Sequence, residues 1–376
     1  MADILLSPGI RSNLLALQQT TDLITLTQGR LATGKKVNSA LDNASNFFLS
    51  NQFRLSAGNL GTLLDSISNA QKTLDAANAG ITSLTTLLNS ALASATQALS
   101  SSATTATFTG TVTGLTGTSS FTTTSGHTLT VSDGTTSSTI TFAAATTVQQ
   151  ILDSVNNTVG LSIKAELSGD GRILFEARGA TTIVIAGTAV AAELAQYGIA
   201  AGTTAAGTLN STRTSLAAQF DSLRTQIDQL AADSKYNGVS LLSSQSLKVI
   251  FNEAATSFQT LTGVNDTSAG LGVVASGGSF QTNFDINAAV TNVNNALVTL
   301  RNQASTFASN VSVIQARTDF TKQIVNTLTS GADALVLSDP NQEGANMLSL
   351  QTRQQLSSTA LSLATQSDQN VLRLFR

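Results

Sequence analysis

The sequence predicts an α+β protein with a long helical coiled-coil or bundle core formed by both chain ends, an inserted small α+β domain and a second short β region. Apolar residues recur at alternating steps of three and four over long stretches toward both ends of the chain. The only two prolines, Pro8 and Pro340, each precede such a stretch, and the proline-free sequence between them permits very long helices. Between residues 104 and 209 the pattern changes to Thr, Ser and Gly with alternating strands.

Three apolar seams lie in the middle of the chain. One runs over 60–98 without a break, and a shorter one runs over 216–230. The strongest covers 286–335 and would form a helix about 75 Å long. These three stripes can be buried against one another, so we expect them to form the core of a helical bundle.

The two end segments differ from the middle ones because polar residues interrupt their seams. Thr21 and Gln28 interrupt the first, and Gln354, Ser357 and Asp368 interrupt the last. Each segment is marginal as an isolated helix, so we expect their apolar faces to be completed by other subunits. The candidate polymerisation interface consists of Ile10, Leu14, Leu17, Ile24, Leu31, Met347, Leu350, Leu361, Val371, Leu372 and Phe375.

Residues 104–209 are predicted to form one small domain inserted between two helices. Leu129 and Val131 alternate with polar neighbours, and Asp133-Gly134 supplies a hairpin turn to the return strand. A short amphipathic helix follows, and further alternating strands come after it. The second β region, within 236–284, begins after an Asn-Gly pair that favours a tight turn.

Composition excludes several classes of function. Charged residues are 11% of the chain, against about 25% in typical domains, and a net charge of -3 argues against nucleic acid as a partner. Zero cysteines exclude disulfides, thiolate catalysis and zinc fingers, and a single histidine excludes HExxH-type metal sites. We therefore expect no catalytic residues, no cofactor and no metal.

An enzymatic interpretation would depend on His127 alone. A Ser-His-Asp site would need a nucleophile on a strained elbow, and the sequence has no G-x-S-x-G. We expect His127 to be an exposed residue at a strand end.

The beginning of the chain has no basic region followed by a long apolar core, and no stretch approaches the roughly 18 apolar residues of a membrane span. We expect no membrane insertion. The protein is expected either to remain in the cytosol or to leave by a route that does not use a cleaved secretory signal.

Three separated motifs resemble those of bacterial flagellins. The run over 30–45, RLATGKKVNSALDNAS, is similar to the motif that follows the first flagellin helix. YNGVSLL at 236–242 resembles the family's turn after its third helix, and 369–376 resembles its C-terminal signature. Together the matches cover about 1–100 and 210–376. The residues that carry the internal motifs are Arg30, Leu31, Gly34, Asn38, Ser39, Asp42, Asn237 and Gly238.

The inserted domain resembles a small module of flagellins and hook-associated proteins. Its position departs from the best-known flagellins, whose variable domains follow the Asn-Gly turn region. The resemblance implies that 104–209 faces outward, while 1–40 and 338–376 form the inner core of a filament. It assigns 41–103 and 210–337 to a bundle domain that includes the β region at 236–284.

The function implied by this resemblance is that of a structural, non-enzymatic subunit of the bacterial flagellum. Such a chain is exported unfolded by the type III route, and it polymerises outside the cell into the helical filament used for swimming. Its implied partners are other copies of itself, an export chaperone, and the cap and hook-junction proteins. The alternative is a hook-filament junction protein, which shares the terminal helices but caps or joins instead of polymerising indefinitely.

Overall fold

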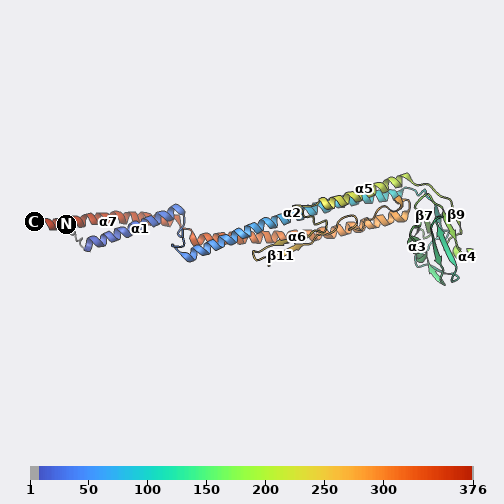
Figure 1. Ribbon diagram of the computed structural model, residues 1–376, viewed down its shortest axis with the longest axis horizontal. Coiled ribbons are helices and arrows are strands. Elements are labelled where there is room, and N and C mark those ends of the chain that lie inside the picture. The colour runs from blue at the N-terminus through green and yellow to red at the C-terminus, as the bar shows by residue number, and fades with distance from the viewer. Residues whose placement is uncertain (1–7, 375–376) are drawn as a thin grey trace. The chain divides into compact units, whose positions relative to one another are not determined.

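The computed structural model describes residues 8–374 and consists mainly of long helices, with small sheets in the middle of the sequence (Figure 1). The predicted α+β class is confirmed. The long helices are α1 (Pro8–Thr33), α2 (Ala44–Ser100), α5 (Ser211–Asp233), α6 (Asn283–Val336) and α7 (Pro340–Leu374).

The chain divides into two compact units. One contains the residues up to 68, 250–258 and those from 315 onward. The other contains 69–249 and 259–314, and therefore includes the inserted domain and α5. The long helices α2 and α6 contribute one part of their length to each unit.

In the first unit, the early part of α2 lies against the end of α6. The Ser50 hydroxyl donates to the carbonyl of Ala332 at 3.0 Å, and Arg54 pairs with Asp333 at 2.7 Å. Gly331 leaves room for the ring of Phe53, whose nearest atoms lie 3.6 Å from the point where a β-carbon would stand. A small residue on α6 thus permits close packing of an aromatic side chain from α2.

The second unit contains the strongest helical core. Its buried positions follow the predicted seams: Leu74, Leu84 and Leu88 on α2 are fully buried, as is Leu300 on α6. The sequence pattern therefore identified the core-facing stripe of both helices correctly. Gly80 allows the end of α5 to approach α2, because a β-carbon there would lie only 2.3 Å from the Ser234 hydroxyl oxygen.

Arg213 of α5 forms hydrogen bonds to residues at the end of α2 and at the start of α6. Its side chain is fully buried in α5, and its guanidinium donates to the Ser101 carbonyl, just after α2, at 2.6 and 3.0 Å. It also donates to the Gln281 carbonyl at 2.9 Å and to Oδ1 of Asn283 at 2.8 Å, where α6 begins. Burial lowers the pKa of Arg213, and these acceptors satisfy a cation that would otherwise be costly to bury.

The inserted domain has three sheets. β4 (Ser137–Thr141), β3 (Thr128–Ser132), β8 (Ile183–Ala186) and β9 (Gly202–Thr204) lie in that order in the largest sheet. The second sheet has the order β1 (Thr107–Thr109), β7 (Ile173–Ala177), β6 (Ile163–Leu167), and the third pairs β2 (Ser120–Thr122) with β5 (Ala145–Thr147). The two short helices are α3 (Val148–Asn156) and α4 (Ala191–Gln196).

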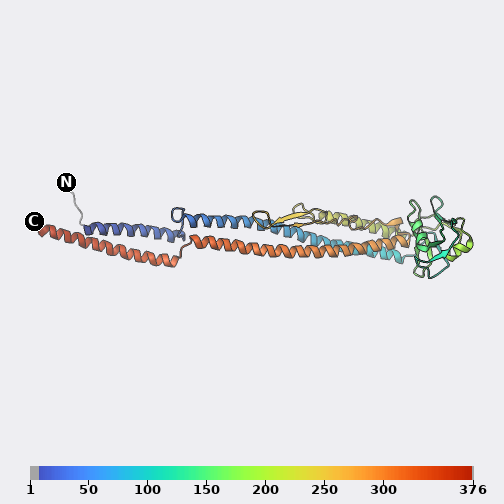
Figure 2. The same ribbon diagram turned by 90° about the horizontal axis from the view of Figure 1, so that it is seen from below.

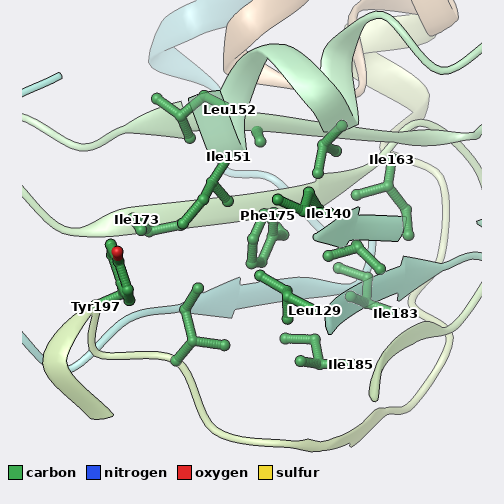
Figure 3. Packing of buried hydrophobic residues seen from close by; sticks show 14 of the residues in the cluster. Leu129, Ile140, Ile151, Leu152, Ile163, Ile173, Phe175, Ile183, Ile185 and Tyr197 are labelled. Atoms are coloured by element: carbon green, nitrogen blue, oxygen red, sulfur yellow. The ribbon is translucent and has the colours of Figure 1, made fainter. Parts of the chain in front are cut away.

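The inserted domain has its own hydrophobic core. Figure 3 shows side chains from α3, β3, β7 and β8 converging, among them Ile151, Leu129, Phe175 and Ile183. The hydroxyl of the neighbouring Tyr197 donates to the Thr146 carbonyl at 2.6 Å, which satisfies a polar atom at the edge of this core. All members of the core cluster lie within 106–199, so the domain buries its apolar face by itself.

Local sequence signals account for much of this domain. The Asp133-Gly134 hairpin is confirmed, with β3 and β4 paired antiparallel and a left-handed φ of 92° at Gly134. The amphipathic helix is α3, and Thr147 with Gln150 forms a capping box at its start. The expected strands did not include β1, β2, β5 and β9, which are only three residues long and too short to show alternation.

The second β region contains two short strands. β10 (Leu247–Ile250) and β11 (Phe258–Leu261) form a two-stranded sheet, and the 3-10 helix η1 (Gly277–Phe280) follows before α6. Most of 236–284 is therefore turn and loop. Such a segment depends on burial against the helices, because an isolated two-stranded sheet is marginal in water.

We expect Asp133→Ala to destabilise the inserted domain by roughly 2–3 kcal/mol, the scale of hydrogen bonds to a charged group. Oδ1 of Asp133 accepts the N–H groups of Thr135 and Thr136, and Oδ2 accepts that of Ser162 at 2.8 Å. Burial opposes ionisation, but these bonds outweigh it and hold the pKa of Asp133 well below its usual range. Urea unfolding of the full chain, followed by the circular dichroism of the strands, measures the loss.

The same substitution has a defined pH dependence. The pKa of Asp133 is lower in the folded protein than its unfolded value of 3.8. The ionised carboxylate therefore stabilises the folded state above pH 3.8, and this stabilisation is lost as the pH falls through the folded-state pKa. The wild type should therefore lose its advantage over Asp133→Ala in strong acid. Asp153→Ala, which removes an exposed carboxylate of α3, is the control; an equal loss in both variants would contradict the role given to Asp133.

We expect Asp266→Asn to stabilise the second unit at pH 8 but not at pH 4.5. Asp266 is completely buried, and burial raises its pKa to about 6 although the side-chain amide of Gln303 opposes the rise. A raised acid pKa gives stability that is lost as the pH rises through that value, so the neutral amide should gain on the order of 2 kcal/mol at alkaline pH. Urea unfolding at both pH values checks this, and an equal effect at the two would contradict it.

Candidate assembly surface

The terminal helices α1 and α7 pair antiparallel along their length, as both views of the chain show (Figures 1 and 2). Arg30 near the end of α1 contacts Glu343 near the start of α7, with 3.4 Å between the guanidinium and carboxylate atoms. Further along the pair, Thr20 and Arg353 line the same groove. The helices α1 and α7 thus form one two-helix element within the first unit.

The face of α1 that meets α7 differs by one heptad position from the predicted seam. Ile10 and Ile24 of the predicted seam are buried within the single chain, although we expected their face to be completed by other subunits, and the second buried row contains Thr20 and Thr27 in place of Thr21 and Gln28. The Thr20 hydroxyl donates to the Ala16 carbonyl at 2.7 Å, so its polar atom is satisfied within its own helix. That bond lets the threonine methyl group face the partner helix without leaving a buried hydroxyl unpaired.

This shift changes the position of the predicted interface residues. Leu14 and Leu31 are exposed on α1, and Leu17 is half-buried. On α7, Met347, Leu350 and Leu361 are half-buried. Val371 and Leu372 lie in α7, whose side chains are not described there, and Phe375 lies outside the described residues.

Among the described side chains of the two helices, six other leucines are exposed. They are Leu15, Leu23 and Leu26 on α1 and Leu348, Leu356 and Leu363 on α7. The three on α7 are 62–68% exposed, so together they add large apolar side chains to the surface beside the packed seam. The sequence analysis did not single them out, although Leu356 and Leu363 recur with a seven-residue spacing beside the seam.

Two grooves lie between α1 and α7 next to these leucines. One of about 360 Å³ is lined by Leu23 and Leu356 together with Arg353. The other, of about 250 Å³, is lined by Leu23, Leu26 and Leu350. The pair therefore presents both apolar projections and hollows on its outer surface.

The motif residues between α1 and α2 form a compact turn. Gly34 has a left-handed φ of 68°, and its carbonyl accepts the N–H of Ser338 at 3.0 Å. Asp42 accepts the backbone N–H groups of Asn38 and Ser39 at 2.9 and 2.8 Å. The bonds from Ser39 and Asn38 lower the pKa of Asp42, so the charged carboxylate organises this turn.

The second motif also forms a turn, at the end of α5. Asn237 and Gly238 have left-handed φ angles of 49° and 80°. Tyr236 and Val239 exchange two backbone hydrogen bonds of 3.0 Å across them. An Asn-Gly pair with two positive φ angles is the geometry that this dipeptide favours in tight turns.

His127 is partnered, unlike the exposed histidine that the sequence led us to expect. Its Nδ1 lies 2.8 Å from Oε2 of Glu193, and its side chain is 32% exposed. Glu193 also accepts the N–H groups of Thr124 and Val190. The bond to His127, followed by those from Thr124, lowers the pKa of Glu193 to about 2. This arrangement connects the start of β3 to α4.

Two further features bear on the kind of site present. Over residues 8–374, none of the helices has an apolar run of the length that crossing a bilayer requires. Among the described side chains, no three or more His, Cys, Asp or Glu residues gather closely enough to hold a metal ion.

The terminal helices pair with each other, the middle helices form a long bundle, and the bundle carries an inserted domain. Together these features indicate a structural protein. The chain matches the bacterial flagellin N-terminal helical region over residues 11–117 and the bacterial flagellin C-terminal helical region over 290–375. It is 35% identical to Flagellin FljM of Caulobacter vibrioides over 163 residues, which are 43% of this chain and 59% of FljM. Flagellin A of Rhizobium meliloti is 37% identical over 92 residues, 24% of this chain and 23% of that protein.

This chain belongs to the bacterial flagellin family, which is a family of structural proteins. The chain spans about three fifths of the length of FljM and the other Caulobacter flagellins that it matches. The two family regions lie at the two ends of the sequence, where the structure places the paired helices and the bundle.

We expect Gly34→Ala to weaken the turn that joins α1 to the bundle by about 1 kcal/mol, because alanine is strained at a φ of 68°. No atom lies within 4 Å of the added methyl group, so the effect is conformational. Gly29→Ala is a matched control inside α1, equally free of clashes, and should raise helix stability. Thermal unfolding followed at 222 nm checks this; a shift of the same sign in both variants would contradict it.

Proposed function

We propose that this protein is a structural subunit of the bacterial flagellar filament, which serves swimming motility. The single observation that carries the proposal is the α1–α7 pair of a flagellin-family chain with eight exposed leucines among its described side chains. Exposed apolar rows of this kind mark a surface that is covered by a partner. The partner is another copy of the same chain.

The physical mechanism is a contact between different surfaces of neighbouring subunits. Exposed leucines stand along α1 and α7, and the groove lined by Leu23 and Leu356 opens between the helices. A head-to-tail contact that does not close into a ring generates an open helical assembly. In this arrangement 1–40 and 338–376 form the inner core, and 104–209 faces outward.

The remaining bundle assignment follows from the same arrangement. The regions 41–103 and 210–337, with the β region at 236–284, surround that inner core. They carry the long buried seams of α2 and α6, and these seams leave the exposed residues of the same helices available for neighbouring bundles.

Export and further partners complete the proposal. A chain without cysteine can pass unfolded through a type III channel and refold outside the cell with no disulfide to form. The partners are an export chaperone, the cap and the hook-junction proteins, and the site of action is the extracellular filament. The relatives that match are named flagellins, which favours the filament subunit over a hook-filament junction protein.

A fragment spanning 33–339 should remain folded and monomeric at concentrations at which the full chain forms filaments. The fragment keeps the bundle and the inserted domain but lacks almost all of α1 and α7. Electron microscopy and analytical ultracentrifugation distinguish the two outcomes. Filaments formed by the fragment would overturn the assembly role of the terminal helices, and failure of the full chain to form long filaments alone would favour the junction protein.

The double variant Leu23→Ser, Leu356→Ser should retain the helix content of the wild type but require a higher concentration to polymerise. Burial of one leucine is worth about 1.5–3 kcal/mol, so the critical concentration should rise at least about tenfold. Val159→Ser is the control, because Val159 is 94% exposed on the inserted domain. Sedimentation of polymer measures both, and an unchanged critical concentration in the double variant would contradict the proposed surface.

A further inference from the structure

The inserted domain meets the start of α6 through one face of the sheet formed by β1, β7 and β6. The opposite face carries Ile163, Ala165 and Phe175, which belong to the domain's own core. Alternation along the strands places Lys164, Glu166 and Glu176 on the other face, and Lys164 lies directly across from Glu176. Lys164 and Glu176 are nonetheless only 8% and 2% exposed, so α6 covers charged side chains.

Two polar contacts connect this face to α6. Oε2 of Glu176 accepts the backbone N–H of Asn283, the first residue of α6, at 2.6 Å. Arg178, just after β7, pairs with Asp285 through two guanidinium nitrogens, of which Nε lies 2.7 Å from Oδ2. A carboxylate at a helix N-terminus and a two-point Arg–Asp pair are both favourable arrangements.

The cations near this joint are all engaged with other groups. The Lys164 ammonium donates to the Asn156 carbonyl at 2.6 Å and lies 5.6 Å from the centre of the Phe284 ring. Arg178 is held by Asp285, and Arg213 of α5 is surrounded by carbonyl oxygens.

As a result, Glu166 and Glu176 have no ion pair among the described residues. Lys164 shares the strand face with Glu166, but its ammonium is directed to the Asn156 carbonyl. The other groups near Glu166 are the carboxylates of Glu176 and Asp285 and the side-chain amide of Asn287. Glu176 in turn faces Arg213, Asp285 and the first N–H groups of α6.

Ionisation of Glu166 is consequently unfavourable at this joint. Burial, followed by the charge of Glu176, raises the pKa of Glu166 to about 7, although the hydrogen bond with Asn287 opposes the rise. Burial also raises the pKa of Glu176, against the hydrogen bond from Asn283. A raised acid pKa gives stability that is complete below the unfolded value of 4.5 and is lost as the pH rises through about 7.

We propose that this joint is a proton-sensitive latch: the inserted domain is held against α6 when Glu166 is protonated, and it gains freedom relative to α6 when Glu166 ionises. The neutral carboxyl keeps its hydrogen bond to Asn287 and adds no charge beside Glu176 and Asp285. The ionised form places a third carboxylate at a site whose cations are occupied, and repulsion then favours separation of the sheet face from α6. The latch thus acts on the orientation of the inserted domain and leaves that domain's own core intact.

Distance measurements between spin labels test the latch in the full chain. The wild type has no cysteine, so Val159→Cys in the inserted domain and Val298→Cys on α6 provide two unique and exposed labelling sites. The distance distribution should be narrow at pH 5.5 and broader at pH 8.5, with a midpoint near pH 7. Glu166→Gln should keep it narrow at both values, because the amide resembles the protonated acid.

The control is Asp153→Asn, which removes an exposed carboxylate of the same domain. Its distance distribution should broaden between pH 5.5 and pH 8.5 as that of the wild type does. A wild-type distribution independent of pH, or a Glu166→Gln distribution that broadens like the wild type, would overturn the latch.

A second measurement follows the glutamate carboxyl groups directly and needs no spin label. The chain contains five glutamates, so carbon-13 labelling of the glutamate carboxyl carbons gives few signals to assign. We expect one signal to titrate near pH 7 and to be missing in Glu166→Gln. Titration of all five signals below pH 5 would overturn the proposal.

Discussion

The burial of heptad stripes is the interaction on which the rest of this structure depends. A helix such as α2 or α6 carries one continuous apolar face, and long helices of this kind are stable only when that face is covered. Leu74, Leu84 and Leu88 are fully buried in the bundle, and the buried Arg213 connects the ends of α2, α5 and α6 through its hydrogen bonds. The inserted domain is attached beside that point, where its polar sheet face covers the start of α6.

The terminal helices satisfy the same requirement only in part. Burial of Ile10 and Ile24 against α7 closes one seam within the chain. The leucines beside this seam, including Leu23 and Leu356, stay in water. A two-helix pair has too little surface to cover all its own apolar residues, and this is the physical reason for which it can serve as an assembly element once further helices pack on it.

The fold could be predicted far better than the candidate surface. The seam of α2 and the Asp133-Gly134 hairpin depend on local periodicity and turn chemistry, and both appear where they were expected. The face of α1 could not be chosen in the same way. Leu14 and Thr20 lie on adjacent rows of one helix, and only the position of α7 decides that Thr20 is covered while Leu14 is exposed. The partnership of His127 with Glu193 likewise joins residues far apart in the sequence.

The sequence by itself determined the long helical segments and the family, because each is carried by patterns of residues that are close together along the chain. Only the tertiary structure decided which groups share a buried environment. Glu166, Glu176 and Asp285 come from three elements, and nothing in their spacing indicates that they meet. Their meeting is set by the way in which a sheet face and a helix start are brought together, and the electrostatic energy of charges depends on distance in space and on burial.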